Sequence, residues 1–159
     1  TNLSQQLDIK RKEATELIAN YFTQYNGLKN YMDETVEFAR EHGYVKTLLG
    51  RKRKLRDINS RNGMIRSNAE RIAINTPIQG SAADMIKVAM IKIHQALKDG
   101  NFKTKMILQV HDELVFDVYK PELETIKPII ENEMKNAMPN LQVPILVGMD
   151  TGENWLEAH

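Results

Sequence analysis

The segment best suited to chemistry is Gln109–Val115, where the polar pair His111 and Asp112 lies between two apolar runs. A two-residue β-turn favours Asn-Gly or Asp-Gly, so a His-Asp tip departs from a local preference, and such departures often mark functional sites. A carboxylate at the tip of two strands is held in place and still reaches solvent, which suits a ligand of a hard cation such as Mg²⁺. Asp112 is therefore the candidate metal ligand, although an ordinary solvated turn capped by this aspartate explains the local pattern equally well.

Glu113 follows Asp112 directly. Because neighbouring strand residues point to opposite faces, the two acids are not expected to coordinate one ion equally. A complete metal site would need further acids from elsewhere. The chain has no cysteine, which excludes disulfides and thiolate metal sites. The histidines are too far apart in sequence to indicate a zinc site or a His-Asp phosphohydrolase, which needs more of them close together. They are His42, His94, His111 and His159.

A second set of polar residues, Arg71, Asn75 and Gln79, is spaced by four and so lies on one face of a helix. Their side chains donate hydrogen bonds, and every base pair of DNA offers acceptors in its minor groove, whatever the sequence. Such a face could test the geometry of a base pair without reading its identity. A solvated helix face explains the same spacing, but Pro77 and Gly80 in this stretch indicate a special backbone.

Basic residues are concentrated in one stretch of a nearly neutral chain. The totals are 22 Lys and Arg against 21 Asp and Glu, a net charge of +1. Positions 46–66 hold a single acid, Asp57, and eight basic residues: Lys46, Arg51, Lys52, Arg53, Lys54, Arg56, Arg61 and Arg66. Arg51–Arg56 could therefore neutralise phosphates, the sequence-independent part of nucleic-acid affinity. A solvated loop is the alternative.

The elements that must position these residues are mostly helices. Apolar residues recur at helical spacing over residues 10–25 and 28–36, with an interruption expected at Gly27 and a C-terminal cap at Gly43. A longer helix is predicted from Asn68 to Lys98, bent or divided by its proline and glycine. Residues 44–49 favour a strand, and the basic run after them fits either a hairpin or a loop.

The remaining elements indicate the α+β class. Two runs rich in Val, Leu and Ile predict a β-hairpin over Met106–Val118, with the His-Asp pair at its tip. A helix is expected to open at Pro121 and continue to about Met138, and a last strand is expected at Val143–Met149. With 159 residues, 42% of them hydrophobic, one compact domain or a piece of one is expected. No apolar run approaches the ~20 residues that span a bilayer, so no membrane partner is expected.

Four segments together resemble bacterial family A DNA polymerases. Gln109–Val115 resembles motif C of that family, and Arg71–Asp84 resembles the palm helix that precedes it. Tyr44–Arg53 is similar to the family's Gly-Tyr-Val-x-Thr-x-x-Gly-Arg-x-Arg segment, and Gly152–Trp155 to its C-terminal ending. The resemblance covers essentially the whole chain, in order.

This resemblance implies a role for each candidate residue. Asp112 would bind the catalytic Mg²⁺ ions, Glu113 would support that site, and His111 would lie against the primer terminus. The residues implied to contact DNA, at the minor-groove side of the primer-template or at template phosphates, are Arg71, Asn75, Gln79, Arg51 and Arg53.

The resemblance also implies parts that this sequence does not contain. Family A enzymes carry a second metal-binding Asp on motif A and a fingers helix that holds the incoming nucleotide. The chain begins at Thr1 without an initiator Met, so we expect a fragment: an incomplete polymerase palm, with long helices packed on a small antiparallel sheet. Residues 1–60 are expected to form fingers-side helices and the basic segment, and residues 61–159 the palm helix, hairpin, final helix and strand.

The implied function is that of the C-terminal part of a DNA-directed DNA polymerase. Its parent would add deoxynucleotides to a primer by two-metal phosphoryl transfer, in replication and repair. Primer-template DNA and dNTP would be its partners, Mg²⁺ its cofactor at a site only partly present here, and the bacterial cytoplasm its location. The isolated chain is expected to be inactive, and a non-catalytic duplex DNA-binding module is the alternative. Uncovered apolar strands also predict self-association as a dimer.

Overall fold

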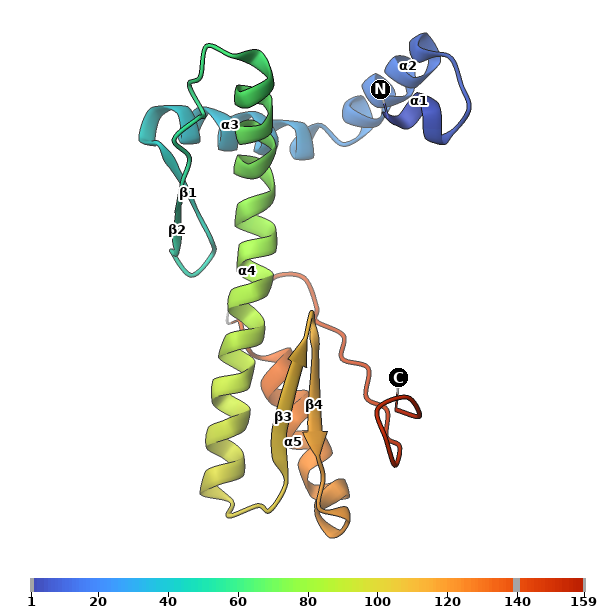
Figure 1. Cartoon of the computed structure of the whole chain (residues 1–159), viewed down its shortest axis with the longest axis vertical. Coiled ribbons are helices and arrows are strands. Elements are labelled where there is room, and N and C mark those ends of the chain that lie inside the picture. Colours follow the sequence, from blue (N-terminus) through green and yellow to red (C-terminus); the bar gives the residue numbers. More distant parts are fainter. Residues whose placement is uncertain (1, 139–140, 159) are drawn as a thin grey trace. The chain divides into compact units, whose positions relative to one another are not determined.

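The computed structural model describes residues 2–138 and 141–158, in which long helices are joined by two short hairpins (Figure 1). The elements are α1 (Asn2–Gln6), α2 (Arg11–Gln24), α3 (Asn26–His42), β1 (Tyr44–Lys46), β2 (Lys52–Lys54), α4 (Gly63–Asp99), β3 (Lys105–Val110), β4 (Glu113–Asp117), the 3₁₀ helix η1 (Lys120–Glu122) and α5 (Leu123–Lys135). Helices with two small antiparallel sheets confirm the α+β class. The chain forms two compact units, the first ending at Ile78 and the second beginning at Gln79. The expected division near residue 60 stays a prediction.

Helices α2 and α3 form where apolar spacing predicts them. Gly43 ends α3 with the left-handed φ of +73°, and its N–H donates to the carbonyl of Ala39, as expected of a C-terminal glycine cap. The break before α3 lies at Tyr25 rather than at Gly27, which is inside α3. Tyr25 leaves helical geometry with φ −110° and ψ 56°, while its N–H still donates to the carbonyl of Tyr21, so the break does not use the conformational freedom of glycine.

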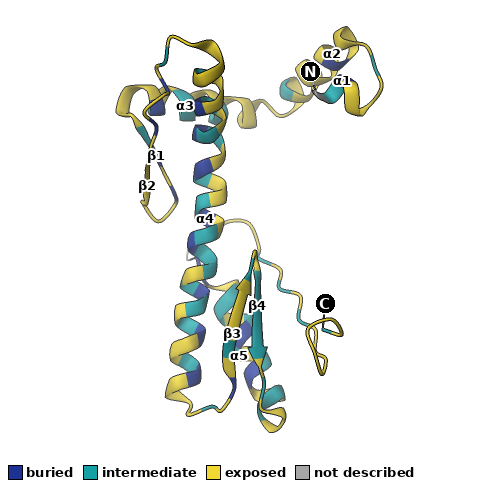
Figure 2. Ribbon diagram, viewed as in Figure 1, coloured by how far each residue is buried: buried dark blue, intermediate teal, exposed yellow. Residues whose placement is uncertain are grey.

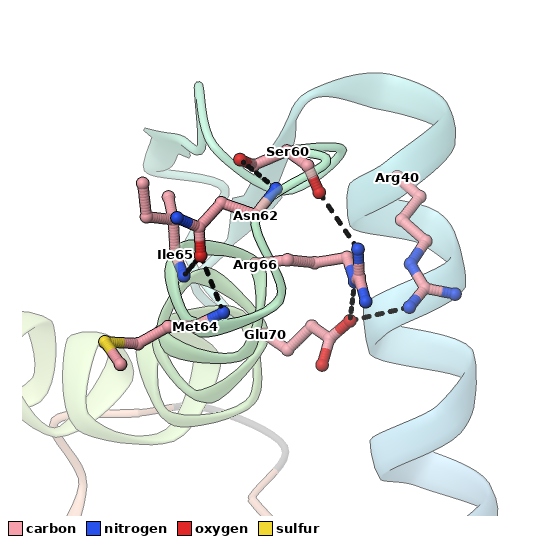
Figure 3. A network of polar contacts seen from close by, with 7 residues as sticks. All are labelled: Arg40, Ser60, Asn62, Met64, Ile65, Arg66 and Glu70. Carbon is pink, nitrogen blue, oxygen red and sulfur yellow. Dashed lines mark hydrogen bonds and ion pairs between the residues drawn. The ribbon is translucent and has the colours of Figure 1, made fainter.

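Helix α4 begins at Gly63, earlier than the predicted Asn68. The side-chain oxygen of Asn62 accepts hydrogen bonds from the N–H groups of Met64 and Ile65, at 3.0 and 3.4 Å, and so caps the first turn (Figure 3). The helix then continues for 37 residues, and its proline and glycine do not divide it. Among the residues described, no helix combines bilayer-spanning length with a sufficiently apolar composition.

An ion-pair network joins α3 to the start of α4 (Figure 3). Glu70 Oε1 lies 2.6 Å from Arg40 NH2 and 3.7 Å from Arg66 Nε. Arg66 also donates to the carbonyl of Ser60, and Asn59 donates to the carbonyl of Arg40. Partly exposed pairs contribute at most ~1 kcal/mol each, so most of the stability of this unit comes from apolar packing. Its buried core consists of Ala39, Val45, Leu55, Ile58, Ala69 and Ala73.

The second unit packs α5 and the β3–β4 hairpin against the C-terminal half of α4 (Figure 2). Leu114 and Phe116, two apart on β4, both face this core, as the period of a strand requires. A bulge between Met106 and Leu108 leaves Ile107 unpaired with β4. The predicted hairpin and final helix are therefore present. The buried core is Ala89, Ile93, Leu97, Ile126, Ile130 and Ala137.

The predicted strand at Val143–Met149 is wrong, because residues 141–150 form no strand. A strand requires a neighbour, and both sheets of the described chain contain only their two hairpin strands. Pro144 also lacks an N–H to donate. Ile145, Val147 and Met149 are partly buried, and Met149 packs against the core of the second unit, whereas Val143 and Leu146 remain 67% and 89% exposed. The segment therefore gains some burial, but among the described residues it has no backbone partner that would make it a strand.

Glu122, at the end of η1, anchors the start of β3. Its carboxylate accepts hydrogen bonds from the N–H groups of Lys103 and Thr104, at 2.9 and 3.0 Å, and from the Thr104 hydroxyl at 2.7 Å. That hydroxyl oxygen also accepts from the N–H of Tyr119. Desolvation opposes ionisation of the carboxyl, but these hydrogen bonds and the Lys103 charge outweigh it and hold the pKa of Glu122 below its ordinary value. Ionised Glu122 therefore ties together the two ends of the hairpin.

We predict that Glu122→Gln lowers the melting temperature at neutral pH. Because the folded pKa is depressed, the contribution of the charge is present above the unfolded pKa and is lost as pH falls through the folded value. The difference from the natural chain should therefore shrink in acid, measured by thermal melts across a pH series. Glu124→Gln, on an exposed site of α5, is the matched control. A pH-independent difference, or an equal one in the control, would contradict this account.

Candidate functional site

The β3–β4 hairpin reverses direction in only two residues. Val110 pairs with Glu113, so His111 and Asp112 alone form the turn. His111 adopts φ +52°, a left-handed conformation that costs a residue with a Cβ about 1–2 kcal/mol. Gln109 Nε2 donates to the carbonyl of His111 at 2.9 Å and supports this conformation. A strained residue at an exposed tip is a reason to look for function there.

Asp112 lies exposed at this tip, and Glu113 is partly buried at the first position of β4. The carboxylate of Asp112 suits a hard cation such as Mg²⁺, which takes oxygen ligands. However, residues 2–138 and 141–158 contain no group of three or more side chains that could hold a metal ion together. Asp112 and Glu113 can therefore supply part of a metal site, and further ligands would have to come from outside these residues.

Helix α4 carries Arg71, Asn75 and Gln79 at four-residue intervals, and all three are exposed. Ala73 and Thr76, on the other side of the same turns, are buried. The three predicted residues therefore form a polar face of the helix. Arg71 and Asn75 belong to the first unit, and Gln79 is the first residue of the second.

The stretch that fitted either a hairpin or a loop is a hairpin, β1–β2, closed by Gly50 at φ +83°. Its register pairs Val45 with Arg53, so both side chains lie on one face. Val45 is buried in the core of the first unit, and Arg53 NH1 lies 3.4 Å from the hydroxyl of Thr76 on α4. Arg51 lies in the connection between the strands, where its backbone N–H donates to the Thr47 hydroxyl. The two predicted phosphate contacts thus have different surroundings.

A groove of 780 Å³ in the first unit brings some of the predicted residues together. Arg53 from β2 and Arg71 from α4 both line it, although they are distant in sequence. Arg56, from the run expected to neutralise phosphates, and Asn68, one turn before Arg71 on α4, line the same groove. Three arginines and Lys54 line the groove against one acid, Asp57, and this excess of positive charge favours an anionic ligand. The basic run already contained Arg56, but only the fold shows that it shares a groove with α4.

The structure therefore groups the predicted residues by unit. Arg51, Arg53, Arg71 and Asn75 belong to the first unit, and within it Arg53 and Arg71 meet at one groove. Gln79, His111, Asp112 and Glu113 belong to the second, where the last three are consecutive at the hairpin tip. The first set offers cationic and amide donors, and the second offers a carboxylate with an adjacent imidazole.

Comparison with known proteins gives a consistent family. Residues 1–157 match DNA polymerase family A. DNA polymerase I of Caldicellulosiruptor bescii is 51% identical over 156 residues, and DNA polymerase I of Streptococcus pneumoniae is 53% identical over 156 residues. Each match covers 98% of this chain but only 18% of the relative, so this chain spans less than a fifth of the length of these proteins.

A solved structure agrees with these relatives. It is the POL domain of Pol1 from M. smegmatis, in complex with DNA primer-template and dNTP. The match has a TM-score of 0.93 and 44% sequence identity, and it covers 98% of this chain and 27% of the other. The likeness therefore extends from sequence to backbone.

The strained turn gives a direct prediction for stability. His111→Val should lower the free energy of unfolding by about 1 kcal/mol, because a β-branched residue is poorly tolerated at positive φ, whereas His111→Gly should not lower it. Urea unfolding monitored by circular dichroism measures both. The same pair at Lys105, within β3, should show the reverse order, because Val suits a strand and Gly weakens it. Equal stabilities for the two His111 variants would contradict the strain at the tip.

Proposed function

This chain belongs to DNA polymerase family A, and we propose that it is the C-terminal part of the polymerase domain of a bacterial DNA polymerase I. The observation that carries the proposal is the exposed Asp112 at a strained two-residue turn, in a chain of this family. The complete protein would add deoxynucleotides to the 3′ end of a primer, with primer-template DNA and dNTP as partners. It would do so in the bacterial cytoplasm, during replication and repair.

At the hairpin tip, Asp112 would supply a carboxylate ligand to Mg²⁺, and Glu113 would support that site from the first position of β4. When bound, Mg²⁺ supplies electrostatic stabilisation of the charge that develops during phosphoryl transfer. His111, which adopts a positive φ next to Asp112 in the turn, would lie against the primer terminus. The short connection supports this role, because the Val110–Glu113 pairing fixes the backbone from which both side chains project.

The DNA itself would be held by residues that do not read sequence. Arg71, Asn75 and Gln79 would donate to the acceptors present at every base pair of the minor groove. Arg51 and Arg53 would contact template phosphates, which contribute affinity whatever the sequence. The positive groove of the first unit supports this assignment, since Arg53 and Arg71 both line it.

A second candidate function applies to the 159-residue chain by itself. Its described residues hold no group of three metal ligands, while the groove and the basic hairpin are complete within the first unit. On its own the chain would therefore be a non-catalytic module that binds duplex DNA. Template-directed incorporation by the isolated chain, lost in Asp112→Asn, would contradict this.

In the full-length polymerase, Asp112→Asn should slow single-turnover primer extension by two to three orders of magnitude, about the loss expected when a group that stabilises transition-state charge is removed. DNA affinity, measured by equilibrium titration, should change little, because the substitution weakens a metal ligand rather than a DNA contact. Asp117→Asn removes the acid at the other end of β4 and is the matched control. Equal losses of rate and affinity, or an equal loss of rate in the control, would count against the assignment.

We also propose that the isolated chain self-associates, most simply as a two-fold dimer. The outer edges of the two-stranded β3–β4 sheet carry no partner strand in the described structure. Ile107 and Leu108 on β3 are 52% and 49% exposed, and Leu146 and Leu156 are almost fully exposed. Unpaired edges and apolar side chains favour association with another chain. Light scattering across a dilution series should give a mass that rises with concentration, and a constant monomer mass would exclude the dimer.

A further inference from the structure

The outward face of the β1–β2 hairpin is set by its register. Tyr44 pairs with Lys54, and Lys46 pairs with Lys52. Paired residues share a face, and these four lie on the face opposite Val45, which is buried in the core. One aromatic ring and three lysines are therefore gathered on the side of the hairpin that faces away from that core.

Tyr44 holds two of these lysines in place. The ammonium groups of Lys46 and Lys52 lie over its ring, 5.6 and 4.5 Å from the centroid. The ring is itself fixed, because Phe38 and His42 of α3 pack edge-on against it, with centroids 5.7 and 6.0 Å away. A lysine side chain is normally free to adopt many conformations, so an anchored ring that attracts two ammonium groups pre-organises both charges.

This arrangement concentrates charge of one sign. Like charges directly opposite on two strands repel each other, and Lys46 lies opposite Lys52. Within residues 2–138 and 141–158, neither ammonium group has a carboxylate within ion-pair distance. The run of residues 44–56 contains no acid at all. Two lysines that face each other without a nearby carboxylate repel each other. This arrangement indicates a ligand that supplies the negative charge.

We propose that Tyr44, Lys46 and Lys52 form a binding site for a backbone phosphate of nucleic acid. The proposal rests on the proposed function for the identity of the anion, which is then the DNA held by the polymerase. The two ammonium groups contact the phosphate oxygens as point charges, and the ring positions them. The site is distinct from Arg53, which lies on the opposite face of the hairpin beside α4.

The test is the salt dependence of DNA binding by the full-length polymerase. The logarithm of the binding constant falls linearly with the logarithm of salt concentration, and the slope loses about one unit for each phosphate contact removed. Lys46→Ala/Lys52→Ala should therefore reduce the slope by one to two units. Lys10→Ala/Lys12→Ala removes the same charge from the start of α2 and should leave the slope unchanged. An equal effect of the two double variants, or none from the first, would overturn the proposal.

Two substitutions of the ring separate its role from that of the charges. Tyr44→Phe keeps the aromatic face and should bind DNA as the natural protein does, whereas Tyr44→Leu keeps apolar bulk and should weaken binding and lower the slope. Natural affinity and slope in Tyr44→Leu would overturn the role of the ring.

Two DNA probes identify which phosphates are bound: a blunt duplex, and a duplex with a single-stranded overhang. If Lys46→Ala/Lys52→Ala changes the salt slope with both probes, the site binds duplex phosphates, and if it changes the slope only with the overhang probe, the site binds single-strand phosphates. This test measures DNA binding and not primer extension. If neither the natural polymerase nor any variant extends a primer, the proposed polymerase activity is wrong, but the salt slopes still decide whether the phosphate site exists.

Discussion

The two-residue connection between β3 and β4 is the constraint on which the candidate catalytic site depends. It leaves His111 and Asp112 alone to reverse the chain, so the backbone of His111 adopts a positive φ and the carboxylate of Asp112 lies at an exposed tip. The strands below the tip are fixed, because Leu114 packs into the core of the second unit and Glu122 binds the start of β3. The exposed carboxylate therefore projects from a fixed backbone, which suits the metal-binding role proposed for Asp112.

In the first unit, the register of the β1–β2 hairpin determines which face each basic side chain lies on. Residues 51–56 contain five basic side chains. Of these, the ones on β2 lie alternately on the two faces of the β1–β2 hairpin. Arg53 lies beside α4, where it shares a groove with Arg71, while Lys52 lies over Tyr44 on the other face. A chain with a net charge of +1 thereby presents two separate cationic surfaces. Both surfaces suit phosphates, one through arginines beside α4 and the other through lysines over the ring of Tyr44.

Local patterns predicted much of the fold but not the features that need a neighbour. Helical spacing and Gly43 located α2 and α3, and two runs rich in Val, Leu and Ile located the hairpin that carries Asp112. The early start of α4 depends on one side-chain cap, Asn62, before a stretch with little apolar periodicity. The strand predicted near Leu146 fails because pairing is a property of two segments. For the same reason, the sequence identified the basic run but could not indicate which of its members face α4.

The account centres on Asp112 as a metal ligand at the hairpin tip, and metal-directed cleavage of the protein backbone tests this most directly. Fe²⁺ replaces Mg²⁺ in the full-length polymerase bound to primer-template DNA, and added hydrogen peroxide oxidises it to Fe³⁺, releasing hydroxide and a hydroxyl radical at the metal site. Ascorbate returns the iron to Fe²⁺, and the radicals cut the nearby backbone. We expect cuts within residues 110–113, suppressed by excess Mg²⁺ and absent in Asp112→Asn. Cleavage that leaves this segment intact, or that persists there in Asp112→Asn and in excess Mg²⁺, would contradict the account.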